Sequence, residues 1–426
     1  SRQQAGKIGK MQLQTLDIEN FRNLAPQTLK FSDGVNLLYG KNAAGKTNTL
    51  ECIYLFASGR SFRTRKETEF IKRGESFAGA DIRFLRAQTQ NAEHMTLRWQ
   101  KTGAQTFVKR MLYQGAETPR ASEFLGIFRA VLFTPDHLSL IKGSPEERRR
   151  FLDMALSQLA PRYVRCMNEY LKVLSQKNSY LKKAVYGTPD NDYLEVLNEQ
   201  LASSGAVLIR QRHAFAERLK ALAGSFYSAL SDSRETLDVR YLSAAGRDFA
   251  ESSDTAALTA RLRDIYRSDR VSELRLGRAL HGPHKDDLAV YIADNASEKE
   301  LDSAADVETD EAAAEAEQAF AKNESKAKIS VSDFNARTFA SQGQQRSAVL
   351  ALKLAEGEIF KEVTGEYPVF LLDDLLGELD AERRSRLLKL IGGRQSIISC
   401  CDRAAFPENA SARVLHITDG LFQTEA

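Results

Sequence analysis

Short apolar runs separated by turn residues dominate the beginning of the chain. Residues 13–18, 28–31 and 35–39 are such runs, and Ser32-Asp33-Gly34 is a turn between two of them. Runs of this length that are bounded by turn residues predict short β-strands. Further strand-like stretches lie around residues 80–85, 95–99 and 131–133.

The middle of the chain has the periodicity of helices. Ser144-Pro145-Glu146-Glu147 has the form of a helix start, with a capping serine, a first-turn proline and a glutamate that can reach back to the cap amide. From there to about residue 230 the sequence reads as helical, with one break at 186–192. Apolar residues recur at three- and four-residue spacing at Leu171, Leu174, Leu181, Leu194, Leu197 and Leu201. Unbroken heptads are missing, so we predict a helical lobe inserted into an α/β domain rather than a long coiled coil.

Charge is unevenly distributed along the chain. The formal net charge is +3, but residues 294–328 hold eleven Asp or Glu against four Lys, a net charge of −7, so the rest carries +10. The same stretch has few large apolar side chains, which predicts a solvated, mostly disordered insertion. A basic body suggests a polyanionic partner, although charge alone does not choose between DNA, RNA and an anionic surface.

Composition excludes several classes of protein. The 426 residues, 42% of them hydrophobic and 27% charged, suffice for two or three globular domains. No apolar run reaches the ~18 residues of a membrane span. Residues 1–10 are polar and basic and have no apolar core, unlike a secretory signal. They are either an added segment or a longer start, and we expect Met11 to be the natural beginning. The four cysteines do not have the spacing of a metal site or of a disulfide framework, which predicts a protein of the reducing cytoplasm. They are Cys52, Cys166, Cys400 and Cys401.

A phosphate-binding loop follows the strand predicted at 35–39. Gly40-Lys41-Asn42-Ala43-Ala44-Gly45-Lys46-Thr47 matches G-x-x-x-x-G-K-[ST], and Asn48 leads into a helix predicted over 49–56. The glycines let the backbone curl so that its amides point at phosphate oxygens, and the helix N-terminus adds a favourable dipole. Lys46 supplies a positive charge to the β- and γ-phosphates, and the Thr47 hydroxyl can ligate Mg²⁺. The loop therefore predicts ATP binding.

An apolar strand that ends in two acidic residues follows much later in the chain. Pro368 precedes Val369-Phe370-Leu371-Leu372-Asp373-Asp374 and can start a strand without losing a ladder bond. Asp373 would bind Mg²⁺ beside the phosphate loop, and Asp374 would orient or deprotonate the attacking water. The long separation argues against a small GTPase or kinase, in which the two motifs lie much closer.

A serine and glycine helix start stands one helix ahead of the acidic strand. Ser341-Gln342-Gly343-Gln344-Gln345-Arg346 precedes a helical run over 347–360, and its hydroxyl and free amides can receive a phosphate. ABC-type ATPases carry their signature motif at this place, and Gly377-Glu378-Leu379-Asp380 stands where their dimer-crossing loop lies. The motifs together predict an α/β fold of the ABC-type ATPase head, a P-loop NTPase with a mixed sheet, with the helical lobe inserted.

These motifs divide the chain into three parts. We predict an N-terminal part of the ATPase head at 11–143 and a helical arm lobe at 144–270. The C-terminal part of the head follows at 271–426 and contains the acidic insertion.

Several further segments make the chain resemble the RecF family of bacterial recombination mediators. They are Asn20-Phe21-Arg22-Asn23, Asn48-Thr49-Leu50-Glu51, Gly59-Arg60-Ser61-Phe62-Arg63-Thr64, Thr134-Pro135-Asp136, Gly143-Ser144-Pro145 with Arg148, Arg149, Arg150 and Asp153, and Gly282-Pro283-His284-Lys285-Asp286-Asp287-Leu288. The resemblance covers residues 11–292 and 329–426, and the acidic insertion falls outside the family pattern.

The resemblance implies a head like that of SMC-type ATPases with a short helical arm. It also implies an ATP-dependent homodimer in which Lys46 of one protomer faces Ser341 and Gly343 of its partner, within a signature that includes Gln342 and Gln344. RecF-like proteins bind DNA, favour junctions of duplex with single strand, and help RecR and RecO load the recombinase at gaps. Their hydrolysis is slow and DNA-stimulated, and they act in the cytoplasm at the nucleoid.

Some positions depart from the general ABC pattern. Gly377 begins the crossing loop where serine is usual. Asp374 stands where most ABC ATPases have glutamate, although aspartate is what RecF-like chains usually show. Ser399-Cys400-Cys401-Asp402 occupies the place of the switch histidine of transporters. No glutamine of the kind that forms a lid is evident near residues 134–138.

Two arginine clusters are candidates for DNA contacts. Arg60 and Arg63 follow the phosphate-loop helix, whereas Arg148 and Arg149 open the helical lobe. Arginine contacts to phosphate give sequence-independent, salt-sensitive binding. Charge runs are often only solvated faces, so both interpretations stay open.

Two alternatives compete with a DNA-binding ATPase that uses ATP and Mg²⁺. A structural SMC-type head that joins other proteins would carry long heptads, which the middle of this chain lacks. A transporter ATPase subunit would carry the switch histidine and would lack the RecF-type segments. We therefore expect a DNA partner and no membrane partner.

Overall fold

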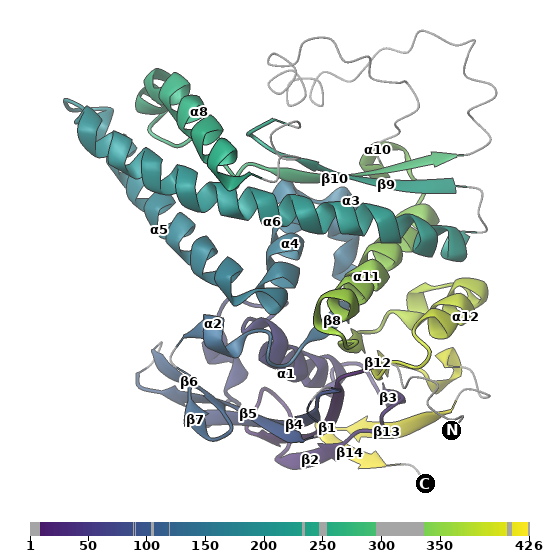
Figure 1. Cartoon of the computed structure of the whole chain (residues 1–426). Coiled ribbons are helices and arrows are strands. Elements are labelled where there is room, and N and C mark those ends of the chain that lie inside the picture. The colour runs from purple at the N-terminus through teal and green to yellow at the C-terminus, as the bar shows by residue number, and fades with distance from the viewer. Residues whose placement is uncertain are drawn as a thin grey trace, which may run out of the picture.

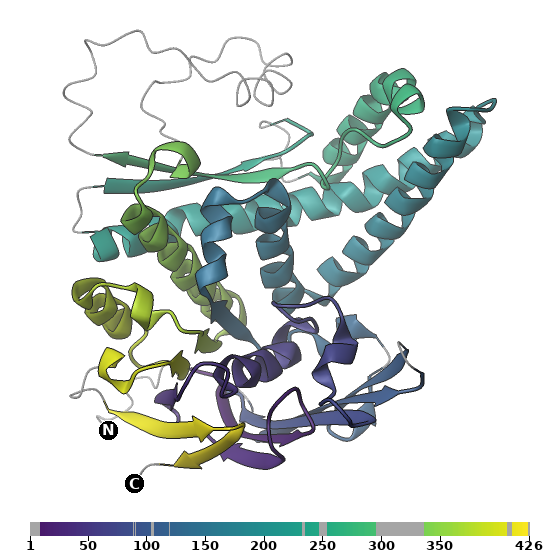
Figure 2. The ribbon, with the colours of Figure 1, turned by 180° about the vertical axis from the view of Figure 1, so that it is seen from behind.

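Two six-stranded sheets and a set of long helices make up the molecule (Figure 1). The computed structural model describes residues 9–87, 89, 91–103, 106–118, 120–231, 235–246, 254–294, 336–406 and 411–424. The sheets lie at one end with helix α1 (Lys46–Ser58) packed between them, and the long helices extend away from this end (Figures 1 and 2). This arrangement confirms the predicted α/β head with inserted helices.

The first sheet carries the strands that lead into the predicted chemistry. Its order is β14-β13-β3-β12-β11-β8, and all neighbours are parallel except β13 and β14. The strands are β3 (Val35–Tyr39), β8 (Ala130–Phe133), β11 (Val369–Leu372), β12 (Ser396–Cys400), β13 (Ala412–Thr418) and β14 (Leu421–Thr424). Parallel strands are covered on both faces, which explains why these segments read as continuous apolar runs. The segments that follow β3, β12 and β11 meet at one edge of the sheet.

Alternating side chains of these strands contribute to two apolar cores. In β3, Leu38 packs with α1 and the second sheet, whereas Leu37 packs with the helical lobe. In β11, Leu371 lies in the core with α1 and the second sheet, and Leu372 lies in the core with the helical lobe. The period of two in a strand thus lets one sheet hold both layers together.

The second sheet is antiparallel and has the order β2-β1-β4-β5-β6-β7. Its strands are β1 (Gln12–Glu19), β2 (Gln27–Lys30), β4 (Phe77–Leu85), β5 (Ala92–Lys101), β6 (Phe107–Tyr113) and β7 (Ala116–Glu117). The strands predicted near the N-terminus are confirmed with small differences in their bounds. The sequence did not predict β6 or β7, whose alternating exposed and half-buried positions give a weak apolar signal.

The helical lobe packs on the other face of the parallel sheet. Its helices are α4 (Pro145–Leu159), α5 (Pro161–Ala184), α6 (Asn191–Ser231) and α8 (Thr255–Leu276). The two-stranded antiparallel sheet of β9 (Glu235–Leu242) and β10 (Asp287–Asp294) lies against α6, as does α11 (Gln342–Thr364) (Figure 1).

The ends of the lobe follow from local capping. The predicted start is confirmed, because the Ser144 backbone N–H donates to Glu147 Oε2 at 3.2 Å and completes a capping box. Helix α8 continues past the boundary predicted at 270 and ends at Gly277, whose φ of 65° suits glycine at a helix C-terminus. The predicted acidic insertion at 294–328 lies outside the described residues, apart from Asp294 at the end of β10.

Shorter elements connect these layers. They are α2 (Ala121–Phe124), α3 (Ser139–Lys142), α10 (Ala336–Phe339), α12 (Ala381–Leu390) and the 3₁₀ turns η1 (Glu67–Phe70), η2 (Pro135–Leu138), η5 (Leu376–Glu378) and η6 (Arg403–Ala405). Among the helices of the described ranges, none is both long and apolar enough to cross a bilayer.

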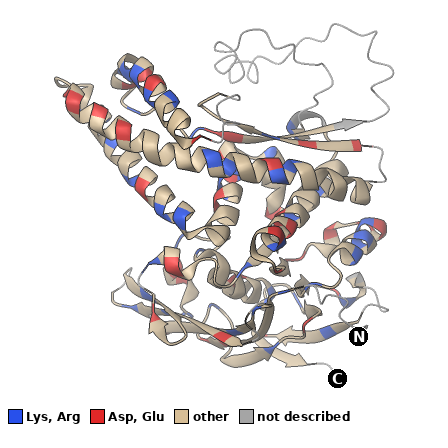
Figure 3. Ribbon diagram, in the orientation of Figure 1, with Lys and Arg blue, Asp and Glu red and all other residues tan. Residues whose placement is uncertain are grey.

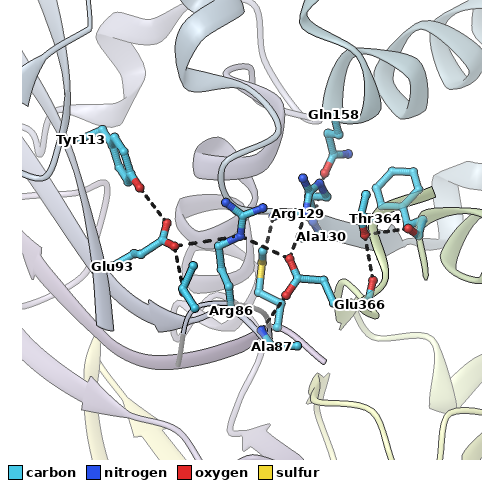
Figure 4. Close-up of polar contacts among 12 residues, drawn as sticks. Arg86, Ala87, Glu93, Tyr113, Arg129, Ala130, Gln158, Thr364 and Glu366 are labelled. Carbon is cyan, nitrogen blue, oxygen red and sulfur yellow. Dashed lines mark hydrogen bonds and ion pairs between the residues drawn. The ribbon is translucent and has the colours of Figure 1, made fainter. Parts of the chain in front are cut away.

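A buried carboxylate ties the end of α11 to the sheets (Figure 4). Glu366 is 1% exposed and follows α11 directly; its Oε1 accepts from Arg129 Nη1 at 3.0 Å, and its Oε2 accepts from the Ala87 backbone N–H at 2.8 Å. Arg86 also donates to Glu366, and its Nε lies 4.0 Å from Glu93 Oε1. One carboxylate therefore joins the end of α11 to β8 and to the end of β4.

Replacing Glu366 by alanine is expected to destabilise the fold strongly. The substitution leaves the Arg129 and Arg86 guanidinium groups without their buried acceptor, which typically costs about 3–5 kcal/mol of unfolding free energy. Urea denaturation followed by circular dichroism measures the change. Glu195→Ala is the control, because it removes a pair with Arg267 whose side chains are 46% and 61% exposed. Equal, small shifts for the two variants would contradict this account.

Candidate nucleotide-binding site

The predicted phosphate loop lies between the end of β3 and the start of α1. Lys46 is the first residue of α1 and is 5% exposed, and its Nζ donates to Gly40 O at 2.6 Å and to Lys41 O at 2.9 Å. Its ammonium group is therefore held over the loop by two backbone carbonyls. A phosphate oxygen could replace these weak acceptors with a charge-assisted partner.

Two glycines of the loop are required by its geometry. Gly40 has a φ of 156°, and a Cβ there would lie 2.3 Å from the carbonyl oxygen of Ile417 in β13. Gly45 has a φ of 123°, and a Cβ there would lie 2.6 Å from Leu24 Cδ2. The backbone contact leaves no room for a side chain at Gly40, and the positive φ at both positions favours glycine, so this curl of the loop depends on the two glycines.

The acidic strand meets the phosphate loop as predicted. Thr47 Oγ1 donates to Asp373 Oδ1 at 2.9 Å, although the two residues are 326 positions apart in the chain. Asp373 directly follows β11 and is 7% exposed. The strand order β3-β12-β11 produces this contact, because the carboxyl ends of these parallel strands share one edge of the sheet.

The donor set at this edge fits a magnesium ion bound together with a nucleotide. Burial raises the pKa of the Asp373 carboxyl above its ordinary value, and the neighbouring Asp374 charge raises it further. A divalent cation would favour the charged form and offset both effects. Within the described ranges, no group of three or more His, Cys, Asp or Glu could hold a metal ion. Magnesium commonly uses one carboxylate, waters and substrate phosphates, which suits Asp373 and Thr47.

Asp374 is held in an unusual backbone conformation next to the metal carboxylate. Its φ is 48°, and its backbone N–H donates to Ser399 Oγ at 2.9 Å. Its carboxylate lies beside the exposed Cys401, whose Sγ is 3.2 Å from Asp374 Oδ2. Asn42 of the phosphate loop reaches the same thiol. The side chain predicted to act on water thus faces the loop from the end of β11.

Asn48 connects the phosphate loop to the segments on either side of it. Its Nδ2 donates to Asn23 Oδ1 at 2.7 Å, and its Oδ1 accepts from Arg63 Nη1 at 2.6 Å. Asn23 Nδ2 in turn donates to Ala43 O in the loop at 2.9 Å. The side-chain contacts of Asn48 therefore hold the phosphate loop in place. Its position beside the nucleotide stays a prediction.

A buried glutamate anchors the same segments beneath Asn48. Glu51 is fully buried in α1 and pairs with Arg22 at 2.5 Å between Oε2 and Nε. Its other oxygen accepts from the Ser61 hydroxyl, and Arg63 Nη1 lies 3.7 Å from Oε2. One carboxylate thus brings together the residues before β2 and those after α1, which explains why these segments accompany the phosphate loop.

The predicted signature motif forms the start of α11. Ser341 is the N-cap, and its Oγ accepts from the Gln344 backbone N–H at 3.2 Å. Gln344 Oε1 accepts from the Ser341 N–H at 2.5 Å, which completes a capping box. Gln342 is exposed, and a Cβ at Gly343 would lie 3.3 Å from Arg383 Nη2.

Arg346 and Arg383 join α11 to the predicted crossing loop at 377–380, and Arg384 of α12 supports the loop from its other side. Arg346 Nη1 donates to Glu378 O at 2.7 Å, and Arg384 Nε donates to Leu376 O at 3.1 Å. Arg383 donates both to Ser347 Oγ in α11, at 3.1 Å, and to Asp380 in the loop. The two elements that the ABC pattern assigns to the dimer interface are therefore braced against each other within one chain.

The arginine clusters separate into exposed and internal residues. Arg60 is exposed, and the Arg63 side chain is 42% exposed. Arg148 is 7% exposed and makes two bonds to the Asp287 carboxylate, at 2.7 and 2.8 Å, so it does not fit the predicted DNA contact. Arg149 is half-buried and donates to the backbone oxygen of Asp286 at 2.6 Å. The half-buried Asp287 carboxylate, a partner that sequence spacing does not reveal, explains the correction for Arg148.

The sequence does not mark Ser399 as part of the site. It stands in the segment at the place of the switch histidine of transporters, yet its hydroxyl contacts Asp373 and the backbone of Asp374. A polar residue near the end of an apolar strand is the only signal in the sequence. Strand order is needed to show that β12 lies between the two motifs.

Comparisons with known proteins agree with this geometry. Residues 12–419 match the family model of the RecF/RecN/SMC N-terminal domain. The DNA replication and repair protein RecF of Exiguobacterium sp. is 33% identical over 419 residues, which cover 98% of this chain and 100% of that protein. The protein of the same name from Pediococcus pentosaceus is 35% identical over 382 residues, which cover 89% of each chain.

Solved structures show the same similarity. The recombination mediator protein RecF with ATP, from the RecFOR pathway, is 31% identical and superposes with a TM-score of 0.80 over 98% of this chain and 100% of that chain. An SMC head bound to the C-winged helix domain of ScpA is 15% identical, with a TM-score of 0.50 over 97% of each chain. The second likeness supports the fold alone.

Proposed function

The chain belongs to the RecF family of DNA replication and repair proteins, and from this premise we propose that it is a DNA-binding ATPase that dimerises around ATP. The observation that carries the proposal is the bond between Thr47 and Asp373, which unites the phosphate loop with the acidic strand. A solved structure of a similar protein is described as RecF with ATP, which supports nucleotide binding by this chain.

The nucleotide site of one chain supplies only part of what an ABC-type ATPase needs. Ser341 and Gly343 stand at the start of α11, where their neighbours include Gln344 and Arg383. In the proposed dimer, the signature of the partner completes the site by offering its hydroxyl and first-turn amides to the γ-phosphate. The bracing of this helix start by Arg383 supports the proposal, since a rigid surface loses less entropy on binding.

Hydrolysis in the proposed site depends on four side chains. Lys46 would bind and neutralise the β- and γ-phosphate oxygens, and Asp373 with Thr47 would hold a magnesium ion, which would shield phosphate charge. Asp374 accepts a proton from, or orients, the attacking water. We propose slow hydrolysis stimulated by DNA, so that ATP times how long the dimer stays closed.

The proposed task is recombinational repair in the cytoplasm, at the nucleoid. Relatives are named DNA replication and repair proteins, and a solved relative is described as a recombination mediator of the RecFOR pathway. We propose that this chain binds junctions of duplex and single-stranded DNA and acts with RecR and RecO to load the recombinase at gaps. A structural SMC-type head remains the alternative, and hydrolysis that responds to DNA would distinguish the two.

The proposed DNA contacts are Arg60 and Arg63. Acidic residues precede most of the basic ones along α6, and both signs alternate along α8 (Figure 3), so neither helix presents a single charge along its whole length. Arg60 is exposed directly after α1, and Arg63 is bonded to Asn48 beside the phosphate loop. A DNA phosphate that engages this segment would be coupled to the nucleotide through Asn48.

Ser341→Arg is expected to retain ATP binding and to lose ATP-dependent dimerisation. The larger cationic side chain would obstruct the signature surface of one protomer without touching its own phosphate loop. Sedimentation velocity with and without ATP measures the monomer and dimer fractions. Lys46→Met serves as the comparison and is expected to lose dimerisation because it loses nucleotide binding. An unchanged dimer fraction for Ser341→Arg would refute the proposed role in the partner's site.

Arg60→Ala is expected to weaken binding of a gapped duplex and to lower its salt dependence. Loss of one phosphate contact should reduce the slope of log affinity against log salt by about 0.7–0.9. Fluorescence anisotropy across a salt series measures both quantities. Arg148→Lys is the control, because Arg148 is buried against Asp287. An unchanged slope for Arg60→Ala would remove Arg60 from the DNA interface.

A further inference from the structure

Ser399 lies in the parallel sheet between the strand before the phosphate loop and the strand before the two acidic residues. It lies near the carboxyl end of β12, which is hydrogen-bonded to β3 on one side and to β11 on the other. Its side chain is fully buried. The strand that leads into the phosphate loop and the strand that delivers the two carboxylates therefore flank this one hydroxyl.

The Ser399 hydroxyl bonds to both acidic residues at once. Its Oγ donates to Asp373 Oδ1 at 2.8 Å and accepts from the Asp374 backbone N–H at 2.9 Å. A hydroxyl has one proton to donate, so these two contacts use its donor and one acceptor site. The proton is directed at the carboxylate, because an amide N–H can only donate.

Two hydroxyls fix the orientation of the Asp373 carboxylate. Oδ1 accepts from Ser399 on the strand side and from Thr47 Oγ1 on the loop side, at 2.9 Å. Thr47 would exchange this bond for a metal when the nucleotide binds, as the donor set suggests. The bond from Ser399 does not depend on the nucleotide and would then be the contact that keeps the carboxylate in place.

The same serine stabilises a strained peptide. Asp374 has a φ of 48°, in the left-handed region that non-glycine residues rarely adopt. The acceptor at Ser399 satisfies the N–H of this residue in a largely buried surrounding, where an unpaired N–H would be costly. The left-handed turn sends the Asp374 side chain toward Asn42 and Cys401, on the phosphate-loop side.

We propose that Ser399 is a positioning residue for ATP hydrolysis, which holds the metal-binding carboxylate of Asp373 and the backbone turn of Asp374 in a fixed relation. The inference rests on the proposed ATPase function. In this role a single side chain at the end of β12 would orient both acidic residues. The competing interpretation is that the hydroxyl only satisfies buried polar groups and stabilises the fold.

Ser396 provides a matched control on the same strand. It is also fully buried in β12, three residues before Ser399, and its hydroxyl has no hydrogen-bond partner in the described structure. Ser396→Ala therefore removes the same atom from the same strand without touching Asp373 or Asp374. Any general effect of losing a buried hydroxyl from β12 appears in this variant as well.

The test separates magnesium-dependent from magnesium-independent nucleotide binding in the full chain. A fluorescent ATP analogue is titrated in EDTA to give the metal-free affinity, and then at increasing Mg²⁺ to give the magnesium midpoint. Ser399→Ala is expected to raise the magnesium midpoint about tenfold and to lower kcat by a similar factor, which corresponds to loss of one well-placed hydrogen bond. The affinity in EDTA should stay within about twofold of the unaltered chain, because Lys46 and the loop amides are unchanged.

The outcomes distinguish this inference from the proposed function. An unchanged magnesium midpoint in Ser399→Ala, or an equal shift in Ser396→Ala, overturns the positioning role while leaving the ATPase intact. A parallel loss of EDTA affinity also overturns it, since that result indicates general damage to the loop. If the unaltered chain neither binds nor hydrolyses ATP with Mg²⁺, both proposals fail.

A second variant covers the case in which Ser399→Ala does not fold. Ser399→Cys keeps a side chain of similar shape and replaces the hydroxyl by a weaker donor. It is expected to fold with a cooperative melting transition and to raise the magnesium midpoint by a smaller factor than alanine. A midpoint equal to that of the unaltered chain would overturn the positioning role.

Discussion

The contact between Thr47 and Asp373 is the constraint on which the rest of the site depends. It joins residues 326 positions apart, and it exists because parallel strands deliver their carboxyl ends to one edge of the sheet. The apolar cores on both faces of that sheet hold the strands in register, so the chemistry at the edge rests on packing elsewhere. The helical lobe and the antiparallel sheet therefore stabilise the strands that carry a small polar site.

The supports are themselves tied to the site by polar side chains. Asn48 and Glu51, both in α1, fix the segments that flank the phosphate loop. At the other end of the head, Arg383 braces the signature helix against the crossing loop, and Glu366 anchors the end of that helix to the sheets. The phosphate loop and the proposed partner-binding surface at the start of α11 are thus connected through fixed elements of one chain.

Much of this architecture could be predicted from the sequence because its signals are local. The phosphate loop requires glycine at positions such as Gly40, and the start of α4 is specified by Ser144 and Glu147 within four residues. Other features depend on strand order or on a distant partner. The role of Ser399 depends on the position of β12 between β3 and β11, which the sequence does not show. The prediction for Arg148 was wrong because its carboxylate partner, Asp287, lies 139 residues away in the chain.

The central claim is that each nucleotide site is completed by a second copy of the chain, and a mixing experiment tests it most directly. Ser341→Arg keeps its own Lys46, and Lys46→Met keeps its own Ser341, so a mixed dimer has one intact composite site. Sedimentation of differently labelled variants with ATP should show mixed dimers, while neither variant alone forms dimers. If the mixture stays monomeric with ATP while the unaltered chain dimerises, the composite site is contradicted.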